Sequence, residues 1–122
     1  GAHHSGLLGE APHPASPAMF VPLLAQVALG QRERLEIFGS DYHTVDGTAT
    51  RDYLRIQDLS EAHVAALEHL QKSRGFDALN LGTGHGHTVL QVVSAFEDVL
   101  WQKLPYQFSE RRQGDAPFAV AI

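Results

Sequence analysis

The stretch Thr88-Val89-Leu90-Gln91 carries the start signal of a helix, because a threonine and a glutamine three residues apart can cap each other's backbone amides. Apolar side chains then share one helical face, at Val89, Val92, Val93, Phe96 and Leu100. Residues 76–81, before this helix, have the composition of a buried strand, and residues 104–108, after it, form another strand candidate. Strand, helix and strand in this order indicate an α/β fold with crossover connections.

A second helix is predicted upstream of this unit. Asp58 and Glu61 have the spacing of a capping box, and an apolar face continues until Gly75, formed by Leu59, Ala62, Ala66, Leu67 and Leu70. Before this helix, Tyr53, Leu54 and Ile56 follow a turn signal at residues 46–48 and indicate a short strand.

The N-terminal third contains two further expected elements. Apolar residues recur at helical spacing from Leu23 to Ala28, after Pro22 and before a stop at Gly30. Residues 35–38 form a short strand candidate, whereas residues 1–16 lack an apolar period and are expected to be irregular. The chain is therefore predicted to be an α/β protein with short strands and two to three helices.

Length and composition limit the classes of protein. The chain has 122 residues, of which 43% are hydrophobic, with a net charge of −5, which fits one region with its own core. Its basic residues form no stripe and no apolar run is long enough to span a bilayer, so neither nucleic acid nor a membrane is an expected partner. The absence of cysteine fits a cytoplasmic protein.

A glycine-rich turn, with Gly82, Gly84 and Gly86, lies between the strand and helix predicted above. Dinucleotide-binding loops occur in this context, but here the third glycine follows the second too closely, and no carboxylate stands about twenty residues later. A tight structural turn is the preferred interpretation, and we expect no cofactor-binding residue here.

Eight histidines are many for this length, and pairs such as His3-His4 and His85 with His87 have the chemistry of zinc or nickel ligands. No helical pair is spaced to bind one metal, because His63 and His69 are six residues apart. Solvated histidines without a metal site are the preferred interpretation. No nucleophile constellation of a hydrolase is present either, so no catalytic residue is assigned.

Two segments place an arginine beside a carboxylate, Arg51-Asp52 and the run from Arg111 and Arg112 to Asp115. A guanidinium can bind two phosphate oxygens at once, and a nearby carboxylate can bind sugar hydroxyls, so the pattern indicates a diphosphate ligand. Ordinary surface ion pairs are the alternative.

Several segments in order carry a resemblance to a known family. They are Gly1-Ala2-His3-His4-Ser5-Gly6, Gly9-Glu10, Gln26-Val27-Ala28, Ile37-Phe38-Gly39-Ser40-Asp41-Tyr42, Asp46-Gly47-Thr48, Arg51-Asp52-Tyr53, Asp58-Leu59, Asn80-Leu81-Gly82-Thr83-Gly84 and Arg111-Arg112-Gln113-Gly114-Asp115. Over practically the whole chain this set resembles the UDP-glucose 4-epimerase family of extended short-chain dehydrogenases.

The resemblance implies a fold and a reaction. Family members combine an N-terminal Rossmann part that binds NAD with a smaller C-terminal part that binds the UDP-sugar, and residues 1–122 are expected to be this second part, with the first part absent. The family interconverts UDP-glucose and UDP-galactose through a 4-keto intermediate, with NAD as hydride carrier and a tyrosine base assisted by a lysine four residues later. Homodimers are typical of the family.

The resemblance also implies roles for individual residues. Arg51 and Arg112 would bind the diphosphate, Asp115 would accept hydrogen bonds from ribose hydroxyls, and Glu36, Ile37 and Phe38 would offer backbone groups to the uracil. Asn80 and the Gly82 to Gly84 turn would be structural.

Several positions depart from the family pattern. Four residues after Tyr42, Tyr53 and Tyr106 stand Asp46, Gln57 and Glu110, so no tyrosine has the lysine partner. Met19 replaces a substrate-contacting asparagine, Ala119 aligns with a tyrosine near the diphosphate, and Trp101 replaces a glycine after the last helix.

These departures leave three explanations for the chain. It is a fragment of an epimerase that is inactive alone, a degenerate relative, or a free-standing UDP-sugar-binding module. Another nucleotide-sugar enzyme of the same superfamily also fits the resemblance. A fragment should expose an apolar patch where its Rossmann partner packs.

Overall fold

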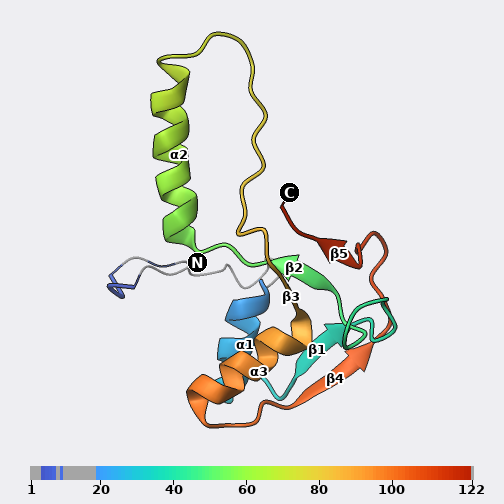
Figure 1. Ribbon diagram of the computed structural model, residues 1–122. Coiled ribbons are helices and arrows are strands. Elements are labelled where there is room, and N and C mark those ends of the chain that lie inside the picture. Colours follow the sequence, from blue (N-terminus) through green and yellow to red (C-terminus); the bar gives the residue numbers. More distant parts are fainter. Residues whose placement is uncertain (1–3, 8, 10–18, 122) are drawn as a thin grey trace.

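The computed structural model describes residues 4–7, 9 and 19–121 (Figure 1). These residues form three helices, α1 (Phe20–Ala28), α2 (Ile56–Leu70) and α3 (Val89–Leu100). They also form five short strands, β1 (Leu35–Phe38), β2 (Thr50–Asp52), β3 (Gly86–Thr88), β4 (Tyr106–Ser109) and β5 (Phe118–Ala119). The predicted α/β class is confirmed, whereas most of the segment predicted to be irregular, residues 1–16, lies outside the described residues.

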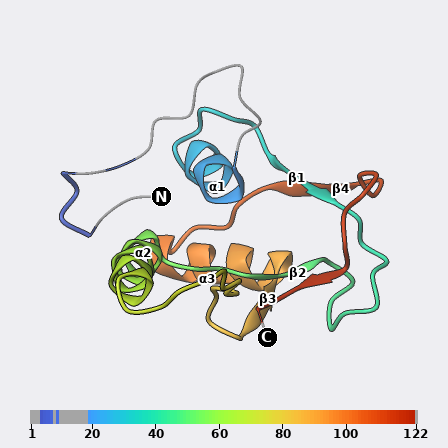
Figure 2. The same ribbon diagram turned by 90° about the horizontal axis from the view of Figure 1, so that it is seen from above.

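The strands form two separate small sheets (Figure 2). In one, β1 pairs with β4 in parallel, with Leu35 opposite Tyr106 and Phe38 opposite Ser109. In the other, β2 is central, antiparallel to β3 and parallel to β5. Strands β1 and β4 are the predicted strands at 35–38 and 104–108, the second beginning two residues later than expected.

One apolar core joins the first sheet to two helices. Its buried members are Leu24 and Val27 of α1, Leu35 and Ile37 of β1, Val93 of α3, and Leu104. Phe20, Val89, Val92 and Phe96 pack against it, so the apolar faces predicted for α1 and for most of α3 are the faces that the fold buries.

The start of α3 is confirmed as a capping box. The Thr88 hydroxyl accepts a hydrogen bond from the Gln91 amide, and the Gln91 side chain accepts one from the Thr88 amide at 2.9 Å. Asp46 fixes this helix start to the preceding loop, because its carboxylate accepts hydrogen bonds from the hydroxyls of both Thr88 and Thr48.

The predictions for residues 53–61 were partly wrong. Helix α2 begins at Ile56 after Arg55, and no side chain caps it, so Asp58 lies in the first turn, where a carboxylate favours the helix dipole, and forms no capping box with Glu61. The strand expected over Tyr53, Leu54 and Ile56 lies earlier, at Thr50–Asp52, because its partners β3 and β5 come from distant parts of the sequence.

The strand predicted for residues 76–81 is absent from the described chain. These residues are exposed, lie in neither a turn nor a strand, and make no backbone hydrogen bond within the described residues. Figure 1 shows them in the long connection from α2 to β3, beside no other strand. A strand needs a partner for its backbone groups, and the described chain supplies none here.

Trp101 ends α3 in the left-handed conformation, with φ 54° and ψ 32°, and its side chain is 95% exposed. We expect Trp101→Gly to raise the free energy of unfolding by about 0.5–1 kcal/mol, because the left-handed region costs a residue with a Cβ about 1–2 kcal/mol and glycine's extra chain entropy offsets part of the gain. Urea denaturation measures the change.

Val99→Gly is the matched control for this experiment. Val99 is also largely exposed but lies inside the helix, so the same replacement should lower stability there. A Trp101→Gly variant less stable than the parent would contradict the expectation.

Candidate functional site

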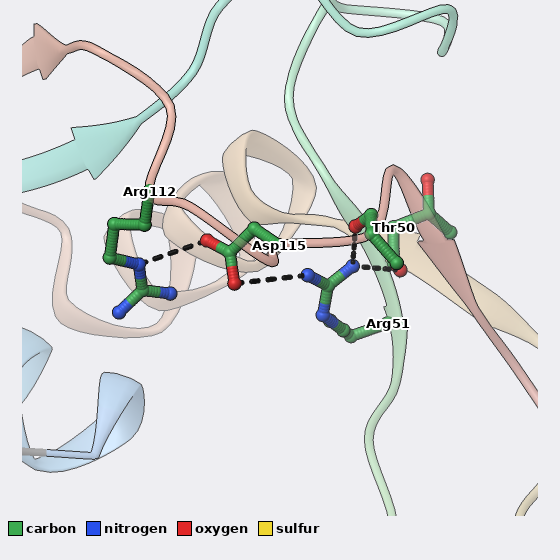
Figure 3. Close-up of polar contacts among 5 residues, drawn as sticks. Thr50, Arg51, Arg112 and Asp115 are labelled. Carbon is green, nitrogen blue, oxygen red and sulfur yellow. Dashed lines mark hydrogen bonds and ion pairs between the residues drawn. The ribbon is translucent and has the colours of Figure 1, made fainter.

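Three of the predicted binding residues, Arg51, Arg112 and Asp115, lie together around the loop that follows β4 (Figure 3). Arg112 and Asp115 belong to this loop, Arg51 lies on β2, and Phe38 ends β1. Contacts join the four in a continuous series from Phe38 through Arg112 and Asp115 to Arg51. Residues from three distant parts of the sequence therefore form one group.

Asp115 connects the two arginines. The Arg112 Nε donates a hydrogen bond of 2.9 Å to one carboxylate oxygen of Asp115, and a terminal nitrogen of Arg51 lies 3.9 Å from the other oxygen. The Asp115 side chain is 23% exposed and that of Arg51 29%, against 61% for Arg112. Two cations are thus held around one half-buried anion, an arrangement that a phosphate group can enter by replacing the carboxylate.

Backbone carbonyls fix the position of Arg51. Its other terminal nitrogen donates hydrogen bonds of 2.8 Å to the carbonyl oxygens of Thr50 and Ala116. The second of these bonds links β2 to the loop that carries Asp115, so the guanidinium is oriented before any ligand arrives. Preorganised donors of this kind lose little entropy on binding.

The ring of Phe38 supports Arg112. The guanidinium carbon lies 4.8 Å from the ring centroid, within the range of a cation–π interaction. The family resemblance assigns Phe38 only a backbone role. No sequence signal indicates that its ring lies against Arg112, which is distant along the chain.

The backbone of β1 alternates between its two edges. The amides of Leu35 and Gly39 bond to carbonyls of Pro105 and Ser109 on the β4 side, so parallel pairing directs the backbone groups of Glu36 and Phe38 to the opposite edge. Within the described residues, β4 is the only strand beside β1, and that edge is open. Ile37 is 2% exposed and its side chain belongs to the core.

Arg111 lies apart from the contacts that join Arg51, Arg112 and Asp115. It donates hydrogen bonds of 2.6 Å to a carboxylate oxygen and to the carbonyl of Asp41, and its guanidinium lies 4.2 Å from the Tyr42 ring centroid. The hydrogen bond from Arg111 lowers the pKa of the Asp41 carboxyl. Of the two adjacent arginines, Arg111 thus fixes the loop after β1, and Arg112 points to the Asp115 carboxylate.

The glycine-rich turn is held by Asp52. Its carboxylate accepts hydrogen bonds from the Thr83 hydroxyl at 2.6 Å, from the amides of Thr83 and Gly84 at 2.9 and 3.0 Å, and from the Ala121 amide at 3.3 Å. A Cβ at Gly82 would lie 2.4 Å from that carboxylate, so glycine permits the close approach. The amides of Thr83, Gly84 and His85 already have hydrogen-bond partners within the chain, so these residues do not fit the pyrophosphate of a dinucleotide such as NAD.

The histidines form no metal centre in the described part of the chain. No group of three or more histidine, aspartate or glutamate side chains there is arranged to hold an ion. His4 lies 3.3 Å from the Gln57 side chain and His69 pairs with Asp77 at 2.9 Å, while His3 lies outside the described residues.

Comparisons with known proteins identify the relatives of this chain. The family described as NAD dependent epimerase/dehydratase matches residues 3–82, well over half of the sequence. The chain belongs to this family. Among relatives named UDP-glucose 4-epimerase, that of Bacillus subtilis is 52% identical over 94% of this chain and that of Homo sapiens 48% identical over 99%. The chain spans about a third of the length of these epimerases, 34% in both cases.

Solved epimerase structures have the same fold over this region. UDP-glucose 4-epimerase from Bifidobacterium longum, in complex with NAD+ and UDP, is 43% identical and superimposes with a TM-score of 0.92, covering 100% of this chain and 36% of that one. The Stenotrophomonas maltophila enzyme, with bound NAD and formylated UDP-arabinopyranose, gives a TM-score of 0.91 at 45% identity, covering 99% and 36%. No helix in the described part of this epimerase-family chain is long and apolar enough to cross a membrane.

Asp52 generates a pH-dependent prediction. The hydrogen bond from the Thr83 hydroxyl, followed by the backbone amides, lowers the pKa of Asp52 from 3.8 to about 2. A folded-state pKa below the unfolded value stabilises the fold above pH ~4, and this stabilisation is lost as the pH falls from ~4 through ~2. We expect Asp52→Asn to be less stable at pH 7 and to lose less stability across that interval.

Thermal unfolding followed by circular dichroism between pH 7 and pH 2 measures this difference. Asp98→Asn, which changes an exposed carboxylate on α3, is the matched control and should retain the parent's profile. Identical profiles for Asp52→Asn and the parent would show that the turn does not depend on this carboxylate.

Proposed function

We propose that this chain is the UDP-sugar-binding part of a UDP-glucose 4-epimerase. Arg51 and Arg112 bind the diphosphate, Asp115 accepts hydrogen bonds from the ribose hydroxyls, and the backbone groups of Glu36 and Phe38 bind the uracil. The backbone groups of Ile37, which the sequence also indicated, face β4 instead. The observation that carries the proposal is the single contact series from Phe38 to Arg51, which joins these groups. The solved relative from Bifidobacterium longum is named UDP-glucose 4-epimerase and is in complex with UDP, and both facts support the proposal.

The proposed geometry matches the chemistry of each part of the ligand. The open edge of β1 presents backbone donors and acceptors, which suit the edge of a pyrimidine base. The two guanidinium groups flank Asp115, at a spacing that one anion already occupies. When a diphosphate binds the arginines, the Asp115 carboxylate is released from one or both pairs and becomes available to sugar hydroxyls.

We further propose that the chain binds UDP-sugar and does not epimerise it alone. Interconversion at the sugar C4 requires a hydride carrier, which in the family is NAD, and the glycine-rich turn held by Asp52 does not fit that cofactor. No tyrosine here is followed by a lysine four residues later, so the base of the family reaction has no counterpart in this sequence.

Removing either arginine tests the diphosphate assignment. We expect Arg51→Ala and Arg112→Ala each to weaken UDP binding by about 10- to 100-fold, because each removes charge-assisted hydrogen bonds worth about 1.5–3 kcal/mol. Isothermal titration calorimetry with UDP, with and without divalent metal, measures the change.

Arg34→Ala is the matched control, since Arg34 is about half exposed and pairs only loosely with its neighbour Glu33, at 4.0 Å. Its affinity should equal that of the parent. A folded parent chain that does not bind UDP would overturn the assignment, as would arginine variants that bind UDP as tightly as the parent.

Ala119 stands at a position where the family has a tyrosine. Ala119 pairs with Arg51 in the parallel ladder, so the two side chains project from the same face of the sheet, whereas Phe118 projects from the other. The exposed Phe118 ring therefore cannot replace the missing tyrosine. We expect Ala119→Tyr to tighten UDP binding about 5- to 10-fold, through one added hydrogen bond to phosphate.

Phe118→Tyr is the control for this variant, because it adds the same hydroxyl on the opposite face. Competition against a fluorescent UDP analogue gives both affinities. The loss of the family tyrosine at Ala119 also favours the alternative function, a degenerate relative or a binding module. If Ala119→Tyr leaves the affinity unchanged, Ala119 does not weaken the site and this argument for the alternative is removed.

A further inference from the structure

The sheet formed by β3, β2 and β5 has two distinct faces. Thr50 and Thr88 are directly opposite each other in the ladder, and both are buried, at 7% and 3% exposure. A Cβ at Gly86 would lie 2.5 Å from a methyl carbon of Thr50, so Gly86 points to this buried face as well. Because side chains alternate along a strand, Arg51 projects from the other face.

His87 shares the face of Arg51. The two residues are directly opposite in the antiparallel pairing of β2 with β3. Side chains at such positions project to the same side, with their Cβ atoms about 4.5–5.5 Å apart. Strand β5 contributes Ala119 on the other side of Arg51, since β2 is the central strand. The row across this face is therefore an imidazole, a guanidinium and a methyl group.

The imidazole of His87 is available to a ligand. Its side chain is exposed, and within residues 19–121 it forms no hydrogen bond or ion pair. His85, two residues earlier, differs in this respect, because its Nδ1 lies 2.9 Å from the carbonyl oxygen of Thr83. Arg51 beside His87 is already held by two backbone carbonyls. A phosphate group that binds Arg51 would thus find a second nitrogen donor at His87.

Anion binding at this face is coupled to the charge of His87. The charged groups that face His87 are the Arg51 guanidinium on β2 and, beyond it, the Asp115 carboxylate of the loop before β5. On its own segment the nearest titratable residue is His85, and β5 presents Ala119, which does not titrate. A cation disfavours a proton on a neighbouring imidazole, and an anion bound between the two favours it. Phosphate binding and protonation of the ring therefore promote each other.

We propose that His87 is a third phosphate-binding side chain, whose protonated ring donates a hydrogen bond to the diphosphate that Arg51 and Arg112 bind. His87 acts at the site of the proposed function, and its role rests on that function. Imidazole is the side chain that ordinarily gains its charge near neutral pH, so the site has two fixed cations and one that depends on pH. The affinity for a UDP-sugar then rises as the pH falls.

Calorimetric titration of the chain with UDP-glucose at about pH 6 and about pH 8 tests this role. Both phosphates of UDP-glucose are esterified, so the charge of the ligand does not change in this interval. We expect the parent to bind about 5- to 10-fold more tightly at the lower pH, through one charge-assisted hydrogen bond. His87→Asn should bind at both pH values with the affinity that the parent has at the higher one.

His87→Lys distinguishes a charged contact from a structural role. Lysine stays protonated throughout this interval, so this variant should bind tightly at both pH values. His85→Asn is the matched control, which removes a neighbouring imidazole and should keep the pH dependence of the parent. A pH dependence that survives in His87→Asn, or that is lost in His85→Asn, would overturn the role of His87.

Proton uptake by the parent needs no substitution. Titration in two buffers with different enthalpies of ionisation counts the protons taken up when UDP-glucose binds near neutral pH. A fractional uptake that His87→Asn removes supports the proposal, and binding without uptake contradicts it. If Arg51→Ala weakens binding while the parent takes up no proton, only the role of His87 fails. A folded parent that does not bind UDP-glucose at either pH would overturn the proposed function and the role of His87 together.

Discussion

The parallel pairing of β1 with β4 is the constraint on which the remaining structure depends. Parallel strands end at the same edge, so the loop after Phe38 and the loop after Ser109 must lie together. This places Arg111 against Tyr42 and Arg112 above the ring of Phe38. Parallel strands also need a long crossover, and the residues between Phe38 and Tyr106 contain α2, α3 and two strands of the other sheet.

The second sheet completes the group of binding residues. Because β5 pairs with β2 in parallel, the chain must return past Arg51 after leaving β4, and the loop with Asp115 lies on that path. The Ala116 carbonyl then bonds to Arg51. Phe38 and Arg112 are therefore positioned by the sheet of β1 and β4, and Arg51 by the sheet of β2. The loop between β4 and β5 links the two sheets and sets the spacing between the arginines.

Local features of the fold could be predicted from the sequence, because their cause is local. The capping box of Thr88 and Gln91 depends on residues within one turn. The strand at 35–38 was predicted from its own apolar composition, although its partner β4 is distant. The position of β2 could not be predicted, since its partners are distant, and the start of α2 at Ile56 has no side-chain cap to mark it. Residues 76–81 show the opposite case, in which strand composition is present but the described residues supply no partner strand.

The binding residues were identified by resemblance, and their contacts were not. Spacing along the sequence cannot show that Asp115 lies between two arginines, or that adjacent Arg111 and Arg112 contact different carboxylates. Those contacts follow from strand register. Trp101 affects how unfolding can be followed by fluorescence, because it is the only tryptophan in the sequence and is almost fully exposed in the folded chain. Its fluorescence already reports water, so its emission is nearly the same before and after unfolding, and the buried Tyr42 is the aromatic residue whose signal distinguishes the two states.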